Sequence, residues 1–313
     1  MKKEYFYIFR IHLEQKNKVM KIAIFGTVFS ENFNKYIQHL VKKLESEKID
    51  IIIESSFYEF LSERLRFHSQ IETFNSSTNL LVEKTDILLS VGGDGTLLKA
   101  TSFVNKTNIP IMGINTGRLG FISSIPPDQI DEAINDLIRG NYSINQRTLL
   151  ELHTENNLFQ NKNFALNEVA IVKKDTSSMI KIDAFINDEF LNTYWADGLI
   201  VSTPTGSTGY SLSCGGPIMT PSSQTFSITP IAPHNLNARP LVISDEIKIE
   251  LSVEGREESH LLSLDSRINS LKNNVKIKIK KANYKIKLAS FKNNSFYKTL
   301  RSKLLWGEDR RNI

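Results

Sequence analysis

The chain has 313 residues, of which 40% are hydrophobic and 23% charged, and its formal net charge is +5. This length suits two domains, and the composition is typical of a soluble globular protein rather than a disordered or fibrous one. The single cysteine excludes an internal disulfide and predicts a cytoplasmic protein, and no apolar run approaches the roughly 20 residues that span a membrane.

Residues 20–142 predict a domain in which strands and helices alternate. The preceding residues 1–19 are charged and broken up, which favours an N-terminal arm over a signal peptide. Strands are expected at 21–26, 49–54, 85–91 and 109–115, and helices at 32–48, 57–67, 96–105 and 126–140. Such alternation predicts an α/β domain with a mostly parallel, Rossmann-like sheet covered on both faces.

Residues 143–313 consist mainly of short alternating segments and predict an all-β, sandwich-type domain. In VKIKIKKANYKIKL (275–288) lysines alternate with Val, Ile and Leu, which predicts a hairpin that turns at KKAN and exposes a solvated lysine face. A nucleic-acid-binding patch is the alternative for these lysines. Residues 298–306 are expected to form a short helix that returns to the first domain.

A glycine-rich turn, GGDGT (92–96), joins the predicted strand 85–91 to the following helix. Glycines let backbone N–H groups approach an anion, and a helix N-terminus favours negative charge, so Gly92, Gly93, Gly95 and Thr96 are candidate phosphate contacts. The turn is not a Walker loop, because no Gly-Lys-Ser/Thr follows it. The dinucleotide fingerprint is absent as well, because KIAIFGTVFS (21–30) has one glycine where that pattern needs three.

Asp94 is unusual in this turn, because a carboxylate repels phosphate unless it has another role. It can hold Mg²⁺ that carries the phosphates, or it can accept the proton of an attacking hydroxyl during phosphoryl transfer. The structural alternative is an aspartate that caps the helix or stabilises a turn. A second glycine turn, INTGRLGF (114–121), either lines the same cleft with Arg118 or only joins a strand to a helix.

Two further polar features lie in the β-rich part. DGLIVSTPTGSTGYSLSCGGP (197–217) crowds hydroxyls and glycines after an apolar strand, with Asp197 at its start. In FALNEVAIV, Asn167 and Glu168 are adjacent polar residues inside an apolar strand, where burial would require partners. A flexible linker is the plainer interpretation of the first of these segments.

GGDGT, then Asn-Glu, then DG-x-x-x-x-TPTGST-x-YSLS-x-GGP, in this order, resemble the NAD kinase family of bacterial type. The resemblance spans residues 21 to about 290, and its most specific part is TPTGSTGYSLSCGGP. It implies transfer of the γ-phosphate of ATP, with Mg²⁺, to the 2′-hydroxyl of the adenosine ribose of NAD. It also implies that the β domain binds NAD and assembles the chain into dimers or tetramers.

The resemblance assigns roles residue by residue. Asp94 matches the family's proton acceptor, Gly95 lies beside it, and Lys99 matches a basic position one turn into the helix. Gly209 stands where many relatives carry alanine, and Arg267 in LDSRI stands where glutamine is also common. The full set of implied nucleotide contacts is Gly95, Lys99, Asn167, Glu168, Asp197, Thr208, Gly209, Tyr210, Ser211, Leu212, Ser213, Ala232 and Arg267.

Two other functions compete with this one. A lipid or sugar kinase can share GGDG, but it leaves TPTGST unexplained. A non-catalytic nucleotide sensor would keep the loops and lose the reactive carboxylate, whereas Asp94 is present. The expected partners are therefore NAD and ATP or polyphosphate, with no nucleic acid, no membrane and no metal site formed by the protein's own side chains.

Overall fold

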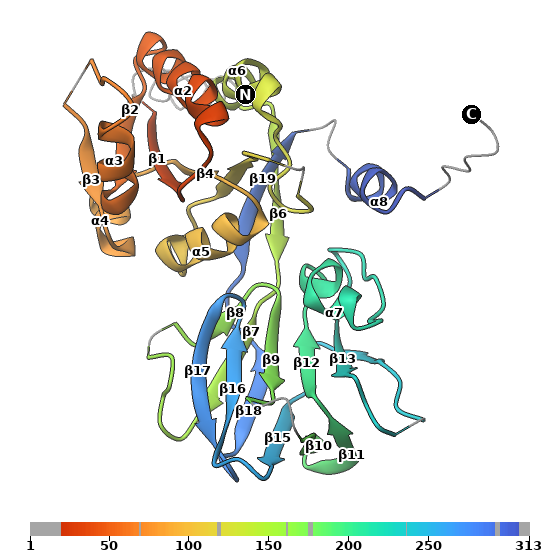
Figure 1. Cartoon of the computed structure of the whole chain (residues 1–313). Helices are drawn as coiled ribbons and strands as arrows, with labels where there is room; N and C mark the ends of the chain where they lie inside the picture. Colours follow the sequence, from red (N-terminus) through yellow and green to blue (C-terminus); the bar gives the residue numbers. More distant parts are fainter. Residues whose placement is uncertain are drawn as a thin grey trace, which may run out of the picture.

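The structure, a computed structural model, describes residues 20–68, 70–117, 120–160, 162–174, 178–235, 237–291 and 295–306. The predicted arm at 1–19 and the predicted contact Arg118 lie outside the described residues. Figure 1 shows an α/β region above a β sandwich, with β6 and β19 rising from the sandwich into the upper region.

The upper region contains a seven-stranded sheet of order β3-β2-β1-β4-β5-β19-β6. Its strands are β1 (Lys21–Gly26), β2 (Asp50–Glu54), β3 (Glu72–Phe74), β4 (Ile87–Val91), β5 (Ile111–Ile114), β6 (Tyr142–Arg147) and β19 (Ile286–Phe291). Every neighbouring pair is parallel except β19 with β6. The prediction of a mostly parallel sheet is therefore confirmed.

Helices cover both faces of this sheet, as predicted, because side chains along each strand alternate between the faces. Ile22 and Ile24 of β1 pack with α2, α3 and α6, whereas Ala23 and Phe25 pack with α4 and α5. The helical elements are η1 (Glu31–Phe33), α2 (Asn34–Ser46), α3 (Ser55–Ser62), α4 (Ser77–Val82), α5 (Asp94–Val104), η2 (Pro127–Gln129) and α6 (Ile130–Ile138). The sequence reading did not include α4 and β3.

Two six-stranded antiparallel sheets form the lower region. The first contains β7 (Leu150–Thr154), β8 (Phe164–Ala165), β10 (Ile180–Ile186), β11 (Glu189–Ala196), β15 (Ile249–Glu254) and β18 (Ile277–Lys281). The second contains β9 (Glu168–Val172), β12 (Gly198–Ser202), β13 (Thr225–Ile231), β14 (Leu241–Ser244), β16 (Ser259–Leu264) and β17 (Arg267–Lys272). One apolar cluster joins both inner faces, which confirms the predicted sandwich.

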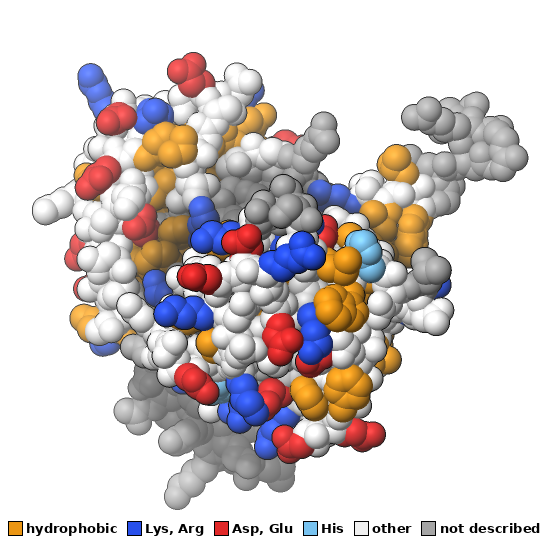
Figure 2. Space-filling view, turned by 60° about the horizontal axis from the view of Figure 1, so that its bottom comes forward, with side chains coloured by type: hydrophobic (Ala, Val, Ile, Leu, Met, Phe, Trp, Pro, Cys, Tyr) orange, Lys and Arg blue, Asp and Glu red, His pale blue; other side chains and the backbone are white. Residues whose placement is uncertain are grey.

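The predicted lysine hairpin is wrong in its pairing. β18 pairs with β15 and β7 in the sandwich, whereas β19 crosses to the upper sheet and pairs with β5 and β6. The alternation itself is as expected, because Ile277 and Ile279 are buried while Lys278 and Lys280 are exposed. Figure 2 shows acidic side chains interspersed with basic ones on this end of the molecule, and Glu250 and Glu151 pair with the two lysines.

The chain crosses between the two regions at β6 and again at β19. Residues 143–147 and 286–291 therefore complete the upper sheet, although the predicted division falls at residue 142. That division remains a proposal. The last described helix, α8 (Phe296–Leu304), follows β19, and Lys303 Nζ lies 5.8 Å from the centre of the Phe121 ring. No described helix is long and apolar enough to cross a membrane.

Helix α5 packs against both regions. Its buried Leu97 and Ala100 belong to the same apolar cluster as Phe164 and Leu166 of the β-rich part. Complete burial of one such side chain contributes about 1.5–3 kcal/mol to folding. The packing therefore fixes the start of α5, which carries the glycine turn, relative to the segment that carries Asn167 and Glu168.

Candidate functional site

Asp94 is the first residue of α5, and its carboxylate is held by another loop. Oδ2 accepts the backbone N–H of Phe121 at 2.7 Å, and Oδ1 accepts those of Ile122 at 3.2 Å and Ser123 at 2.8 Å. The N-cap of α5 is Gly93, and no side chain caps it. The alternative in which Asp94 caps the helix is therefore wrong. The carboxylate does stabilise a turn, as the other half of that alternative expects, and the loop after β5 fixes its orientation.

The glycines around Asp94 leave room for a ligand to approach the backbone closely. Nothing lies within 4 Å of a Cβ built on Gly93 or Gly95, whereas a Cβ on Gly92, at φ +154°, would lie 2.3 Å from Thr96 Oγ1. Thr96 is buried, and its hydroxyl lies 2.9 Å from that of Thr27. Gly93 and Gly95 are thus open to a ligand, while Gly92 and Thr96 shape the turn.

A second carboxylate, Asp265, holds the turn before β9 in a similar way. It accepts the backbone N–H groups of Leu166 at 2.9 Å, Asn167 at 2.7 Å and Glu168 at 3.2 Å. Its side chain is 2% exposed, and burial raises its pKa although the three N–H groups and Arg267 lower it. Three charge-assisted bonds from consecutive residues make this turn rigid.

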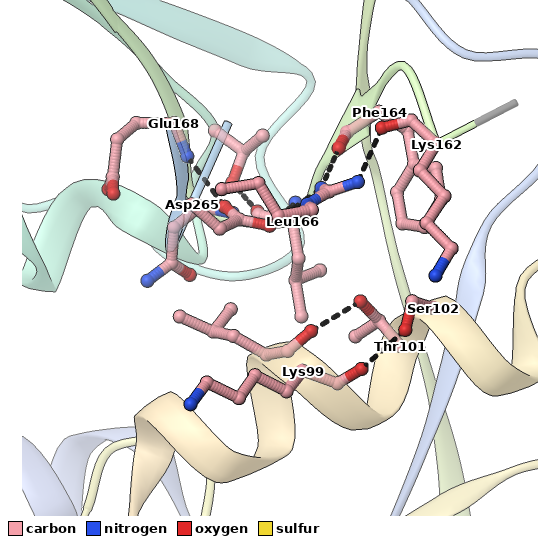
Figure 3. Close-up of polar contacts among 12 residues, drawn as sticks. Lys99, Thr101, Ser102, Lys162, Phe164, Leu166, Glu168 and Asp265 are labelled. Carbon is pink, nitrogen blue, oxygen red and sulfur yellow. Dashed lines mark hydrogen bonds and ion pairs between the residues drawn. The ribbon is translucent and has the colours of Figure 1, made fainter. Parts of the chain in front are cut away.

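Arg267 supports the same turn from the other side. Its guanidinium donates to the carbonyl oxygens of Lys162 and Phe164, stacks 4.8 Å from the centre of the Phe164 ring, and lies 3.7 Å from Asp265. Figure 3 shows these contacts above α5, where Lys99 lies on the side facing Glu168 and Asp265. In the described structure Arg267 therefore positions the turn, and its nucleotide contact stays a prediction.

The side chains of Asn167 and Glu168 each carry a buried oxygen atom that makes no hydrogen bond with a described residue. Asn167 Oδ1 and Glu168 Oε2 are buried and have no hydrogen-bond partner among the described residues. Both side chains converge on Gly209, where a Cβ would lie 3.3 Å from Asn167 Nδ2 and from Glu168 Oε2. Buried polar atoms without partners are costly, so this pair is suited to a ligand that brings hydroxyl or amino groups.

Burial and the nearby Asp265 raise the pKa of Glu168 from 4.5 to about 8. Between these pH values the folded chain keeps a proton that the unfolded chain has released. The free energy of unfolding should therefore fall as the pH rises through this window, by at most about 1.4 kcal/mol per pH unit. We expect urea unfolding to show this loss in the wild type, whereas Glu168→Gln removes the contribution.

Glu257→Gln is the matched control, because Glu257 is an exposed carboxylate of the same region. It should reproduce the wild-type dependence on pH. Parallel pH profiles for the wild type and Glu168→Gln would contradict the raised pKa.

The segment from Thr203 to Ser213 is packed rather than a flexible linker. Thr203 Oγ1 donates to Leu166 O at 2.6 Å, and a Cβ on Gly206 would lie 2.1 Å from Asn167 O. The segment contains η3 (Gly206–Thr208) and α7 (Tyr210–Ser213). Its close contact with the Asn167 turn places the two predicted nucleotide-binding segments side by side.

Within α7 and the preceding turn the side chains have different environments. Ser211 is buried and lies 3.1 Å from the hydroxyl of Thr229, so it supports the fold. Tyr210 is 42% exposed. Burial is the main cause that raises the pKa of the Tyr210 hydroxyl, and the nearby Cys214, Asp197 and Glu168 raise it further. Thr208, Gly209 and Leu212 are half-buried and Ser213 is exposed, so these residues are accessible to a ligand.

Asp197 lies at the edge of a cavity of about 590 Å³ that Trp195 and His234 also line. Its carboxylate forms an ion pair with Lys173 at 2.7 Å, and its N–H donates to Ile231 O. The next residue after Ile231, Ala232, has φ +44°. Asp197 and Ala232 are therefore neighbours, and the nucleotide contacts that the resemblance implies for them stay predictions.

Sequence reasoning missed Asp265. It left open whether INTGRLGF (114–121) lines the cleft of Asp94, and the structure favours this, because Phe121 at its end and the following Ile122 and Ser123 donate to the Asp94 carboxylate. Asp265 has φ +53° between two strands, and aspartate is common at such turns, so its type and place were the only available signal. Among the described residues no group of three His, Cys, Asp or Glu side chains is placed to hold a metal ion.

Comparisons with known proteins bear on this site. Residues 19–142 match the ATP-NAD kinase N-terminal domain, and residues 166–291 match the ATP-NAD kinase C-terminal domain. NAD kinase from Cytophaga hutchinsonii is 48% identical over 294 residues, covering 94% of this chain and 100% of that protein. NAD kinase from Flavobacterium johnsoniae is 49% identical over 295 residues, with the same coverage of 94% and 100%.

Two solved structures have a similar fold. Yeast NADH kinase complexed with NADH has a TM-score of 0.82 at 23% identity, covering 94% of this chain and 89% of that chain. An NAD kinase from Archaeoglobus fulgidus in complex with ATP has a TM-score of 0.68 at 27% identity, covering 91% and 99%. At its low identity, the yeast structure supports the fold alone.

Proposed function

The chain belongs to the NAD kinase family, and we propose that it transfers the γ-phosphate of ATP to the 2′-hydroxyl of the adenosine ribose of NAD, with Asp94 as the proton acceptor. The observation that carries this role is the fixed Asp94 carboxylate. A carboxylate has about four acceptor positions, and three N–H groups occupy three of them. The remaining position is on Oδ2.

The proposed reaction is a single transfer. The 2′-hydroxyl gives its proton to Asp94 Oδ2 as its oxygen bonds to the γ-phosphorus, and the bond from that phosphorus to the β–γ bridging oxygen breaks. The products are NADP and ADP, and the proton later passes to water. Phosphoryl transfer depends mostly on positioning and on stabilising charge, so the fixed geometry of Asp94 matters as much as its basicity.

We propose that the adenosine part of NAD lies against the Asn167 turn and α7. The unpartnered Asn167 Oδ1 would accept a hydrogen bond from its hydroxyl or amino groups. Glu168, which keeps its proton below a pH of about 8, would donate or accept a hydrogen bond at Oε2, and the half-exposed Tyr210 would stack on the adenosine. Lys99, exposed on α5, would contact phosphate. Asp197, Ala232 and Arg267 complete the proposed set, with Arg267 acting mainly on the turn.

Mg²⁺ would enter as a complex with ATP and neutralise charge on its phosphates. The described residues fit this arrangement, since Gly93 and Gly95 leave open space beside Asp94 and the exposed Lys99 would add a cation near the phosphates. Assembly as a dimer or tetramer and a cytoplasmic location also remain proposals, the second resting on the single Cys214.

Purified full-length chain should form NADP from NAD, ATP and Mg²⁺, measured with an NADP-specific coupled dehydrogenase. Inorganic polyphosphate in place of ATP tests the donor. Absence of NADP with either donor, in protein that still binds NAD, would contradict the kinase and favour the nucleotide sensor. Phosphorylation of a lipid or sugar instead would favour the remaining alternative.

A further inference from the structure

Two adjoining cavities of about 380 and 260 Å³ lie against α8 and share Ser124 and Thr299. We call them together the α8 groove. The larger cavity also touches the ends of β6 and β19 and the segment Thr220–Ser222, which follows α7. Its volume of about 380 Å³ lies in the range of small-molecule sites, so it has room for an organic ligand as well as for a small ion.

The α8 groove is separate from the proposed site of phosphoryl transfer. Phe121 and Ile122 line the groove, whereas their backbone N–H groups donate to the Asp94 carboxylate, and Asp94 lines neither cavity. The backbone of this loop therefore separates the groove from the reacting oxygen. Among the described lining residues, none is proposed to bind NAD or to contact the donor. A molecule held in the groove is thus not the one that reacts.

The charged side chains that line the α8 groove are cationic. Among the described residues they are Arg147, at the end of β6, and Lys298 on α8, and no Asp or Glu lines either cavity. Serine and threonine hydroxyls and the amides of Asn145 and Gln146 add neutral hydrogen-bond donors. Cations beside neutral donors suit an anion with several oxygen atoms, such as a phosphate group.

Arg147 has no partner within the described part of the chain. Its side chain makes no hydrogen bond or ion pair there, and its Nε is buried. Burial is the cause that lowers its pKa to about 10, so the group is still a cation at neutral pH. Buried charges are normally paired or hydrogen-bonded, because an unpaired buried ion is costly. An anion in the groove would supply the missing partner.

We propose that the α8 groove is a second anion site of this chain, apart from its substrates, and that it binds a phosphate group through Arg147 and the adjoining Lys298. The inference does not depend on the proposed reaction, because the groove and the reacting carboxylate are separate. Free phosphate and the phosphate group of a larger metabolite share the chemistry that the groove recognises.

The test is thermal unfolding of the full-length chain in inorganic phosphate, compared with chloride at the same ionic strength. A ligand that binds only the folded chain raises the midpoint, so phosphate should raise it in the wild type. Arg147→Met removes the charge and keeps an unbranched side chain. We expect it to lose most of this rise and to weaken calorimetric phosphate binding roughly tenfold or more. No rise in the wild type, or an equal rise in folded Arg147→Met, would overturn the proposal.

Two matched variants locate the effect. Lys99→Met removes the exposed cation near the glycine turn, and Arg139→Met removes an exposed arginine after α6. Both should keep the full rise of the midpoint in phosphate. A rise that is lost in Lys99→Met and kept in Arg147→Met would mean that phosphate binds at the glycine turn, and it would overturn the proposal.

Two further variants guard against a folding defect. Lys298 is exposed, so Lys298→Met should fold normally and weaken phosphate binding a few-fold. Arg147→Lys keeps the charge without the fork of donors and should bind phosphate more weakly than the wild type. If Arg147→Met does not fold, unchanged phosphate binding in both of these variants overturns the proposal.

Calorimetry with inorganic phosphate, AMP and adenosine distinguishes the two sources of the phosphate group. Arg147-dependent binding that is tighter for AMP than for inorganic phosphate identifies a nucleotide, and the reverse order identifies free phosphate. Adenosine binding should not depend on Arg147, and an equal loss of adenosine binding in Arg147→Met would overturn recognition of phosphate. None of these measurements uses NADP formation, so the groove and the kinase assignment can fail independently.

Discussion

Asp94→Asn should lower kcat for NADP formation by about 10²- to 10⁴-fold, the usual contribution of a positioned general base. NAD affinity should stay within a few-fold, because the proposed adenosine contacts lie on the Asn167 turn and α7. The measurement is kcat in the coupled assay together with calorimetric NAD binding. Turnover equal to the wild type would remove Asp94 from the role of base.

The hydrogen bonds of Asp94 predict a second effect of this substitution. Asparagine has one acceptor oxygen, so its amide NH₂ would face at least one of the N–H groups of Phe121–Ser123. One unpaired donor costs about 1–3 kcal/mol, and thermal unfolding should show a lower midpoint. Asp128→Asn, at an exposed carboxylate of η2, should match the wild type in kcat and midpoint.

Local patterns were sufficient to predict the layers of this fold but not all of its pairings. Alternating strands and helices predict a parallel sheet covered on both faces, because each strand repeats the same buried pattern. The period-two pattern at 275–288 identifies two strands equally well. It cannot say that β18 pairs in the sandwich while β19 joins β5, because both arrangements bury the same side chains.

The site residues likewise fall into those that the sequence predicts and those that only the fold brings together. Asp94, Asn167 and Glu168 stand out in the sequence because polar residues interrupt apolar or glycine-rich segments. Asp265 does not, because its role depends on backbone N–H groups about one hundred residues away, which no local spacing encodes.

Gly120→Ala is expected to lower kcat about 100-fold although Gly120 is not itself a reacting group. A Cβ at this position would lie 1.8 Å from Asp94 Oδ1 and 2.5 Å from its Cγ, so the carboxylate has to move. A displacement of about 1 Å in a catalytic group can cost 10²-fold in rate. Overpacking should also lower the free energy of unfolding by about 1–3 kcal/mol.

Gly117→Ala is the matched control, because it lies in the same loop and nothing is within 4 Å of a Cβ built there. Its N–H can still donate to Asn115 Oδ1, so kcat and stability should equal those of the wild type. A Gly120→Ala protein with wild-type kcat would mean that turnover tolerates a displaced carboxylate. A low kcat with unchanged NAD affinity, in protein still folded at the assay temperature, would instead show that the loop after β5 acts by orienting Asp94.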